Sequence, residues 1–300
     1  MDIGIGLPTA MRGTTLEQTL DCARRAEADG FASVATIDRL VYANHDPLIA
    51  LSVVAAVTQR VRLVTAVLIA PYRNTAVLAK QAASLDRMSG GRLVLGVGLG
   101  GRNDDYDAAG VETRGRGTRL TRQLAELKSI WAGEPRGFAG RIGPEPARSG
   151  GPQLLVGGDS EPALRRMACF ADGCVVRAGG PAAFAEQRPR IDAAWQRARR
   201  DGRARAIGLA VYGLGPVAQE EGRRFLLDYY AYAGAHAERI AASMLVTVDA
   251  VRAAAAGFES AGCDELLLFS ASRDPGQVDL LAEAVRPVRS SRQPTMSGGR

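Results

Sequence analysis

The chain has 300 residues, of which 46% are hydrophobic and 23% charged, and this size suits one α/β barrel or two smaller domains. Its net charge of +6 comes from arginines scattered beside acidic residues, without the interleaved aromatic residues of a nucleic-acid-binding surface, so we expect no nucleic-acid partner. No apolar stretch approaches the roughly 20 residues that span a bilayer, and no leader pattern follows Met1, which predicts a cytoplasmic protein with no membrane partner.

Short β-branched segments alternate with amphipathic segments along the chain. The segments that predict strands are residues 3–7, 33–37, 61–69, 93–97, 153–156, 173–176, 207–212 and 265–269. The segments that predict helices are residues 15–29, 47–58, 75–88, 118–131, 161–170, 181–200, 249–261 and 277–285. Strict alternation is typical of parallel sheets, and eight βα units close into a barrel. We therefore predict an α/β fold of the (β/α)8 TIM-barrel type.

Two segments interrupt this alternation. Residues 133–152, rich in Gly, Pro and Arg, predict an insertion before the fifth strand, and residues 220–245 predict extra helices after the seventh strand. We assign residues 1–288 to a single barrel domain. Residues 289–300 form a polar tail that we expect to be disordered.

Histidine and lysine are scarce in this sequence. His45 and His236 are the only histidines, which excludes a metal site built from three or four of them, and we predict no bound metal. Lys80 and Lys128 are the only lysines and fall in predicted helices, away from the strand ends where a Schiff-base lysine would act. A barrel with so little side-chain chemistry is expected to take its reactivity from a cofactor.

A glycine-rich sequence, Gly-Val-Gly-Leu-Gly-Gly, occupies residues 96–101. It matches the dinucleotide-binding pattern GxGxxG, but it follows the fourth predicted strand and leads into polar residues, which argues against a Rossmann fold. The pattern instead indicates a strand end that a flat ring or a backbone segment approaches closely. Gly98 and Gly100 are therefore candidate cofactor-binding residues.

Two turns after the fifth and sixth strands have the composition of phosphate-binding turns. Glycines expose backbone N–H groups, a helix follows each turn, and helix N-termini attract anions. Parallel strands that follow one another are expected to be neighbours, so the turns could form a two-sided cradle for a phosphate. The alternative is two ordinary glycine-containing turns, and Asp159 beside them would repel a phosphate. The candidate residues are Gly157, Gly158, Ser160, Arg177, Ala178 and Gly179.

A long stretch at residues 65–111 resembles the core of the bacterial luciferase-like monooxygenase superfamily, which contains flavin- and deazaflavin-dependent oxidoreductases; it reads TAVLIAPYRNTAVLAKQAASLDRMSGGRLVLGVGLGGRNDDYDAAGV. Supporting similarities lie at residues 3–8, at Asp46-Pro47 and at residues 153–173. The resemblance implies a barrel that binds reduced FMN or coenzyme F420, acts on a small molecule and forms a homodimer. It also implies that the two turns described above hold the cofactor phosphate.

The resemblance assigns further residues around the expected ring. Deazaflavin-using members carry a bulge with a non-proline cis peptide behind the ring, which here points to Ala66 and Val67. Many members carry an Asp-His pair where this chain has Asp38-Arg39, so the usual acid–base imidazole is absent. His45 on the same loop is a candidate replacement, or an ordinary surface residue. Arg39 is the other catalytic candidate, since a guanidinium stabilises negative charge.

Several residues at the strand ends are candidates for substrate contact, or for a salt-bridged loop network. They are Asp38, Tyr42, Tyr72 and Arg102. Sugar-phosphate dehydrogenases of the deazaflavin branch place a carboxylate where this chain has Gly101, which argues against that substrate.

Three functions are consistent with the sequence. The first is an FMN-dependent monooxygenase that takes reduced flavin from a partner reductase and oxygenates a small organic substrate. An F420-dependent oxidoreductase that transfers hydride is the second. A non-catalytic flavin-binding barrel is the third, because the chain is poor in acid–base residues.

Overall fold

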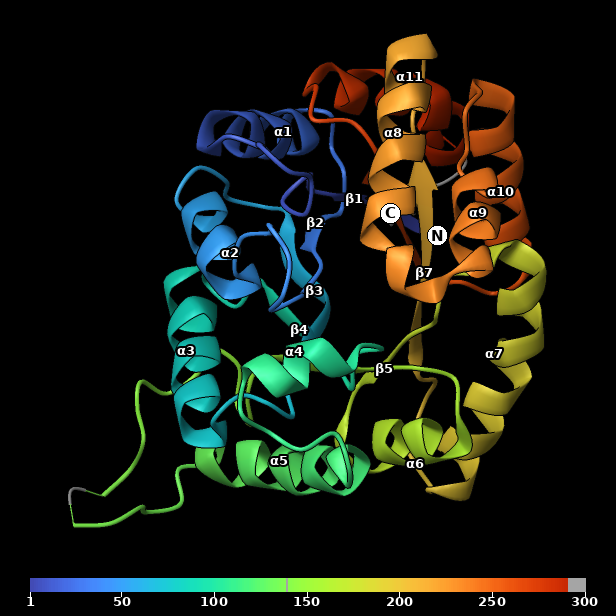
Figure 1. Ribbon diagram of the computed structural model, residues 1–300. Helices are drawn as coiled ribbons and strands as arrows, with labels where there is room; N and C mark the ends of the chain where they lie inside the picture. Colours follow the sequence, from blue (N-terminus) through green and yellow to red (C-terminus); the bar gives the residue numbers. More distant parts are fainter. Residues whose placement is uncertain (139, 291–300) are drawn as a thin grey trace, which may run out of the picture.

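Eight parallel strands form a closed barrel in which each strand pairs with the next along the chain and the last pairs with the first (Figure 1). The computed structural model describes residues 1–138 and 140–290. The strands are β1 (Asp2–Gly6), β2 (Ser33–Thr36), β3 (Arg62–Ile69), β4 (Leu93–Gly98), β5 (Gln153–Gly157), β6 (Gly173–Val175), β7 (Arg205–Tyr212) and β8 (Glu265–Ser270). The predicted α/β class and (β/α)8 barrel are therefore confirmed.

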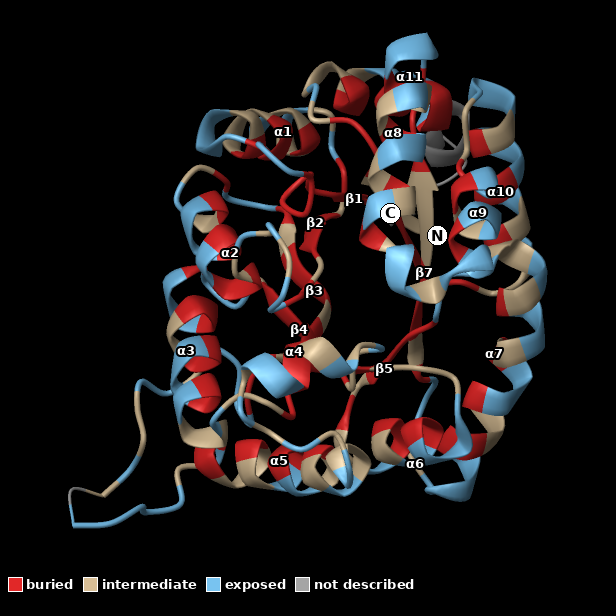
Figure 2. Cartoon of the chain, in the orientation of Figure 1, coloured by how far each residue is buried: buried red, intermediate tan, exposed pale blue. Residues whose placement is uncertain are grey.

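Helices surround the barrel and turn their buried faces toward the strands (Figure 2). They are α1 (Leu16–Ala28), α2 (Pro47–Ala55), α3 (Thr75–Met88), α4 (Asn103–Ala108), α5 (Arg116–Trp131), α6 (Glu161–Phe170), α7 (Gly180–Arg197), α8 (Pro216–Tyr229), the 3-10 helix η1 (Ala231–Ala233), α9 (Ala235–Ala242), α10 (Val248–Ser260) and α11 (Gly276–Ser290). All eight predicted helices are present, with ends shifted by a few residues.

The structure differs from the expected elements in three places. Helix α4 forms in a polar stretch that the sequence pattern left without structure. The extra segment after β7 contains α8, η1 and α9 and begins at Pro216, before the predicted boundary. Helix α11 continues to Ser290, and residues 291–300, most of the predicted tail, lie outside the described residues.

Two hydrophobic layers hold the barrel together. The larger one lies between the strands and the surrounding helices, and it includes Leu51, Leu78, Leu124 and Leu281. A smaller one fills the inside of the barrel with residues from β2 to β8; these are Ala35, Val64, Ala66, Val94, Leu155, Val175, Ile207 and Leu267. The interior is therefore packed, and the main cavity lies at the carboxyl ends of the strands.

The insertion before β5, predicted at residues 133–152, forms no helix or strand among its described residues. In Figure 1 it extends away from the barrel as a long green loop. Among the described helices, none combines the length and the apolar character needed to cross a membrane.

A buried ionic cluster closes the amino-terminal end of the barrel. Glu265, the first residue of β8, is fully buried and contacts the Ser33 hydroxyl. Its carboxylate also pairs with Arg62 at 3.1 Å and with Arg205 at 2.5 Å. All four residues begin strands, so their side chains meet at the amino-terminal end of the barrel. Barrels of this type carry their functional residues at the opposite end, where the strands finish.

Removing this shared carboxylate should destabilise the fold. Glu265→Gln removes the buried counter-charge that Arg62 and Arg205 share and leaves them only the partly exposed Asp2, and losing a hydrogen-bonded charge of this kind costs about 1.5–3 kcal/mol. Urea denaturation should show the free energy of unfolding fall by that amount. Glu238→Gln, which breaks an exposed pair with Arg223, is the control and should change it by less than about 1 kcal/mol. Equal stability of the two variants would contradict the expectation.

Candidate functional site

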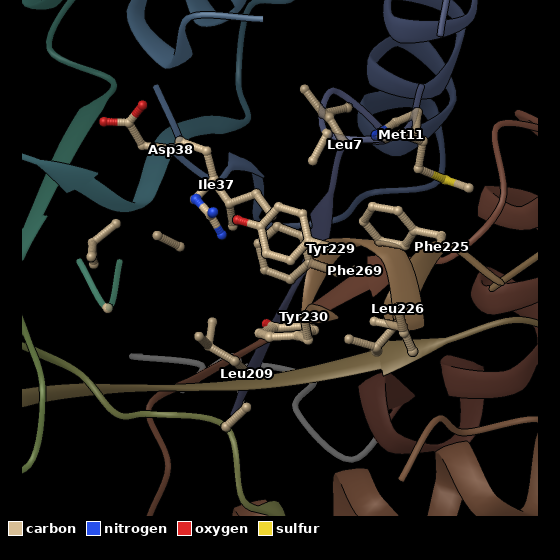
Figure 3. A pocket seen from close by; sticks show the side chains of 18 of the residues that line it. Leu7, Met11, Ile37, Asp38, Leu209, Phe225, Leu226, Tyr229, Tyr230 and Phe269 are labelled. Carbon is tan, nitrogen blue, oxygen red and sulfur yellow. The ribbon is translucent and has the colours of Figure 1, made fainter. Parts of the chain in front are cut away.

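A cavity opens at the carboxyl ends of the strands, where (β/α)8 barrels carry their functional residues. It encloses about 1020 Å³ of space between protein atoms, part of it open to solvent. Its walls are mainly apolar and come from strand ends and from the segment after β7; they include Leu7, Ile37, Leu209, Phe225, Tyr230 and Phe269 (Figure 3). A concave, mainly apolar site with a few polar groups suits a small organic ligand or a cofactor ring.

A bulge in β3 forms one wall of the cavity. Thr65 pairs with Leu95 and Leu68 pairs with Val97, so Ala66 and Val67 together oppose a single residue of β4. The peptide bond between Ala66 and Val67 is cis, and both residues line the cavity. The bulge and the cis peptide predicted at this position are therefore confirmed.

Glycines on β4 and β5 make room for this bulge. A Cβ atom added to Gly96 would lie 2.1 Å from the Thr65 carbonyl oxygen, and one added to Gly98 would lie 2.6 Å from Val67 Cγ2. One added to Gly157 would lie 3.0 Å from both Val67 methyl groups. The predicted close approach of a neighbouring segment is therefore present: the β3 backbone approaches Gly96, and the Val67 side chain approaches Gly98 and Gly157.

The predicted cofactor contacts of the glycine-rich segment stand in different places. Gly98 and Gly157 pack against Val67 and are not among the residues that line the cavity. Gly100 does line it, with a φ of +68° that favours glycine, and Ile69 lies close to its α-carbon. Of these predicted cofactor contacts, Val67 and Gly100 face the cavity, whereas Gly98 and Gly157 lie behind Val67.

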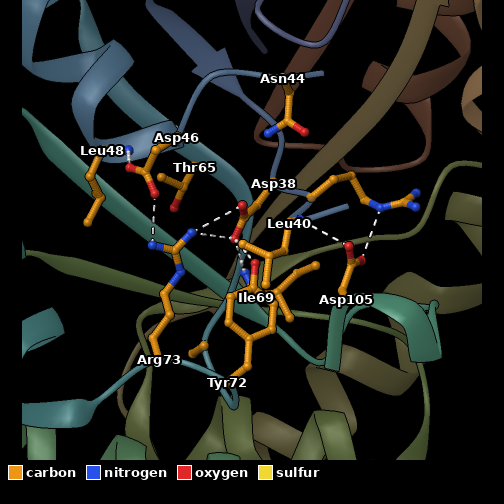
Figure 4. A network of polar contacts seen from close by, with 12 residues as sticks. Asp38, Leu40, Asn44, Asp46, Leu48, Thr65, Ile69, Tyr72, Arg73 and Asp105 are labelled. Atoms are coloured by element: carbon orange, nitrogen blue, oxygen red, sulfur yellow. Dashed lines mark hydrogen bonds and ion pairs between the residues drawn. The ribbon is translucent and has the colours of Figure 1, made fainter. Parts of the chain in front are cut away.

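Asp38 is buried at the centre of a polar network after β2 (Figure 4). Its carboxylate accepts hydrogen bonds from the Ile69 backbone N–H at 2.8 Å, the Tyr72 hydroxyl at 3.1 Å and Arg73 Nη2 at 3.0 Å. Arg73 also pairs with Asp46, which caps the start of α2. Burial raises the pKa of Asp38 above its usual range, against the lowering effect of Arg73. These three bonds reach Oδ2, and Arg73 Nη2 also donates to Oδ1 at 3.2 Å, so both oxygens of Asp38 have partners within the protein.

Arg39, the next residue, points its guanidinium toward a different partner. Its Nε donates a hydrogen bond to Asp105 at 3.1 Å, and the side chains of both residues are nearly fully buried. Asp105 also accepts hydrogen bonds from the backbone N–H groups of Leu40 and Val41. Arg39 lines the cavity, and its buried Nη2 has no hydrogen-bond partner among the described residues.

Tyrosines of the segment after β7 cover the cavity, and the sequence analysis did not assign them to the site. Arg39 lies over the rings of Tyr229 and Tyr232, at 5.1 and 5.3 Å from their centroids. Tyr230 packs edge-to-face on Tyr229, and burial raises its pKa to about 12. From the sequence we expect residues 220–245, with their cluster of tyrosines, to shape the pocket, but the pattern does not tell which side chains face it.

The remaining substrate candidates lie outside the cavity lining. Tyr72 donates to Asp38, and Arg102 pairs with Asp104 beside Tyr232. Tyr42 lines a neighbouring depression, where its hydroxyl donates to Asp228 at 2.5 Å. Burial and Asp228 together raise the pKa of Tyr42 to about 12.

His45 is exposed and does not line the cavity. Its backbone N–H donates to the Thr9 carbonyl oxygen at 3.2 Å, which fixes the loop rather than the ring. The predicted acid–base role of His45 therefore finds no support in this geometry.

The two predicted phosphate turns lie side by side. Strands β5 and β6 are hydrogen-bonded neighbours, with Gly157 paired to Val175, and the Gly158 N–H donates to the Val175 carbonyl oxygen. The Ser160 hydroxyl accepts from the Ala163 N–H at 3.4 Å and so caps α6. The adjoining arrangement follows from the parallel topology, as the sequence predicted.

Arg177 lies in the second turn and already pairs with a residue of the first turn. Its guanidinium is mostly exposed and pairs with Asp159 at 3.1 Å. This contact joins the residue expected to attract a phosphate to the one expected to repel it. Gly179 precedes α7 without a side-chain cap, so the first N–H groups of that helix are available to an anion. Ala178, between them, lines the cavity.

Comparison with known proteins gives a family match and several relatives. The family described as luciferase-like monooxygenase matches residues 1–242. An F420-dependent glucose-6-phosphate dehydrogenase of Nakamurella multipartita is 35% identical over 177 residues, which cover 53% of this chain and 51% of that protein. The chain likewise spans about half the length of the first curated relatives that it matches, 49% for an uncharacterized protein of Mycobacterium tuberculosis that is 32% identical over 43% of this chain.

Solved structures share the fold over nearly the whole chain. The monooxygenase RslO1 from Streptomyces bottropensis superposes with a TM-score of 0.77 and 21% identity, covering 96% of this chain and 100% of that one. An F420-dependent secondary alcohol dehydrogenase in complex with an F420-acetone adduct superposes with a TM-score of 0.76 and 19% identity, covering 95% and 99%.

The contact between Gly98 and Val67 can be tested by a double-mutant cycle. Gly98→Ala places a methyl group 2.6 Å from Val67 Cγ2, and overpacking of this kind costs about 1–3 kcal/mol. Val67→Ala removes the clashing methyl groups, so in the double variant Gly98→Ala should cost much less than in the natural background. Urea denaturation of the four proteins measures the coupling. Strictly additive losses would show that the two residues do not share this space.

Proposed function

Because this chain belongs to the luciferase-like monooxygenase family, we propose that it is an oxidoreductase that binds the ring of F420 or reduced FMN in the cavity at the strand ends. One observation carries the proposal: the apolar, bulged wall of Ala66 and Val67 lines the same cavity as the charged residue Arg39. A flat ring with polar edges needs both kinds of surface.

The residues present fit such a cofactor. Ala66, Val67 and Gly100 would lie against the ring, and Ala178 connects this cavity to the turn that carries Arg177 and Gly179. One molecule with a ring and a phosphate could therefore reach from the bulge to the uncapped start of α7. The helix N-terminus would attract the phosphate through its N–H groups and its dipole.

The cofactor would supply hydride transfer or, as reduced flavin, oxygen activation, neither of which this chain's side chains can perform. The chain itself would exclude water through the tyrosines of α8 and η1 that line the cavity. Arg39 would stabilise negative charge on an oxygen atom, and burial strengthens this effect because the local dielectric is low. Asp38, held by Arg73 and Tyr72, would orient the loop.

Hydride transfer with F420 is the first candidate, because the curated relative of named activity that is 35% identical is F420-dependent. This reverses the order favoured by the sequence alone. The family's description as monooxygenases supports the second candidate, in which a separate reductase supplies reduced FMN for oxygenation of a small organic molecule.

The substrate of that relative is not proposed for this chain. Gly101 has no side chain where the family resemblance placed a carboxylate in sugar-phosphate dehydrogenases. A Cβ atom there would lie 3.4 Å from the Tyr232 hydroxyl, so the tyrosine closes this side of the cavity. A phosphorylated sugar would meet an aromatic wall at this position.

We propose further that the protein is a cytoplasmic homodimer. The outward faces of α2 and α3 carry exposed apolar side chains, among them Ile49 at 67% and Met88 at 84% exposure, and a groove runs between the helices. Burying such a patch against a second copy removes it from water. Light scattering should give twice the chain mass, and Met88→Glu should shift the population to monomers. A wild-type monomer at micromolar concentration would overturn this proposal.

Titration of the purified protein with F420 and with FMN, followed by cofactor fluorescence, tests the proposed function. We expect F420 to bind more tightly. If neither cofactor binds, the proposed function is wrong, and if FMN alone binds, the F420 candidate is dropped. FMN bound without oxygen-dependent turnover would favour a non-catalytic flavin-binding barrel.

Variants of one residue from each turn sharpen this titration. Arg177→Gln removes a charge-assisted contact with the phosphate and should weaken cofactor binding about tenfold. Asp159→Asn frees Arg177 from its present partner and removes a repelling carboxylate, so it should tighten binding. Arg223→Gln, on the exposed face of α8, is the control. Equal affinities in all four proteins would place the phosphate elsewhere.

A further inference from the structure

A second depression lies beside the main cavity, and we call it the α8 depression because half of its lining comes from that helix. It encloses about 830 Å³ of space between protein atoms, part of it open to solvent. Met11 and Phe225 line both hollows, so the two spaces adjoin at these side chains. The rest of the lining is polar and consists of Arg12, Tyr42, Glu221, Arg224, Asp228 and Arg273.

The two carboxylates of the α8 depression have arginine partners from other loops. Asp228 accepts a hydrogen bond at 2.9 Å from Nε of Arg12, in the loop after β1. Glu221 accepts one at 2.9 Å from Nε of Arg273, in the loop after β8. Each pair joins one negative charge to one positive charge, so neither carboxylate is left to balance a third arginine.

Arg224 is that third arginine. Glu221 and Asp228 stand three residues before it and four residues after it on α8, the spacings at which helical side chains form ion pairs. Both carboxylates are engaged elsewhere, and Arg224 forms neither a hydrogen bond nor an ion pair with any residue that the structure describes. Its side chain is exposed, and the lining as a whole carries one excess positive charge. The α8 depression therefore offers an accessible cation to a ligand.

The α8 depression is separate from the two phosphate turns. Its loops follow β1, β2 and β8, whereas the turns follow β5 and β6. In a closed barrel of eight strands that pair in chain order, β1 lies across the barrel from β5. Figure 1 likewise shows α8 and α6, the helix after the first turn, on different sides of the barrel. A cofactor phosphate held by the turns would therefore leave Arg224 unused.

We propose that the substrate is an amphipathic organic acid, whose carboxylate binds Arg224 in the α8 depression and whose apolar chain passes Met11 and Phe225 into the main cavity. A guanidinium presents several N–H donors to a carboxylate, and the single excess charge of the lining matches a monoanion. Leu209 and Phe269 give the chain apolar surroundings in the cavity. The role as substrate rests on the proposed function, whereas the binding of the acid rests on the two adjoining hollows.

Butanoate, hexanoate and octanoate, with octan-1-ol as the uncharged counterpart, test both halves of the site. Their binding to the full chain is measured by ligand-detected NMR at neutral pH, with and without F420. Each methylene that enters the cavity should tighten binding about threefold. Octanoate should bind about three- to fivefold more tightly than octan-1-ol, as expected for an ion pair in contact with solvent.

Two results of this series would overturn the proposal. Equal affinities from butanoate to octanoate would mean that the α8 depression collects an adventitious ion only. Equal affinities of octanoate and octan-1-ol would show that no carboxylate is recognised.

Arg224→Gln tests the cation directly. Octanoate binding should weaken about three- to fivefold, while octan-1-ol binding stays unchanged. Arg223→Gln is the matched control, because it removes the same charge from the neighbouring residue, which pairs with Glu238 and lines neither hollow. No loss in Arg224→Gln, or an equal loss in both variants, would show that this position does not hold the acid.

The outcomes also separate this inference from the proposed function. Arg224→Gln should leave F420 binding unchanged, and Arg177→Gln should weaken F420 binding and leave octanoate binding without cofactor unchanged. If Arg224→Gln weakens F420 binding instead, the α8 depression serves the cofactor and the inference is wrong. If neither F420 nor FMN binds, the proposed function fails, and the acids measured without cofactor still decide whether the site exists.

Discussion

The close packing of the β3 bulge against β4 and β5 sets the shape of the cavity. Val67 can stand at this wall because Gly98 and Gly157 leave the space that a side chain would fill. At Gly96 the neighbouring backbone itself approaches, since a Cβ atom would meet the Thr65 carbonyl oxygen. The apolar surface offered to a ring is therefore a consequence of how three strands pack, and the loops above them add polar groups to a wall that the barrel already provides.

Asp38 and Arg39, which follow β2, belong to two separate ionic networks. The Asp38 carboxylate accepts hydrogen bonds from Ile69, Tyr72 and Arg73, and these bonds hold the loop after β2 to β3. Arg39 is anchored by Asp105, and its guanidinium packs against the rings of Tyr229 and Tyr232. Where the family resemblance led us to expect an imidazole, this chain therefore carries a fixed cation that takes up no proton.

The barrel could be predicted from the sequence because alternation of short apolar strands and amphipathic helices is a local property. The adjoining turns near Gly157 and Gly179 followed from the same topology, and the resemblance located the bulge at Ala66 and Val67. Helix α4 escaped prediction because the partners of its buried Asp105 are Arg39 and backbone groups after β2, 64 residues away for Val41. Tertiary contacts of this kind, like the Arg177–Asp159 pair, leave no periodic pattern in the sequence.

The two sides of the cavity belong to parts of the chain that differ in how tightly packing restricts substitutions. The ring-facing wall belongs to strands whose glycines are fixed by contact, so a change there disturbs the barrel itself. The cover belongs to α8 and η1, an insertion between β7 and β8 that joins the strands through one isolated bridge, Tyr212 with Leu245. Arg39 contacts both sides, since it lines the cavity and lies over tyrosines of the cover. Under the proposed function, the barrel would constrain which ring can bind, and the insertion together with Arg39 would constrain which molecule can lie against that ring.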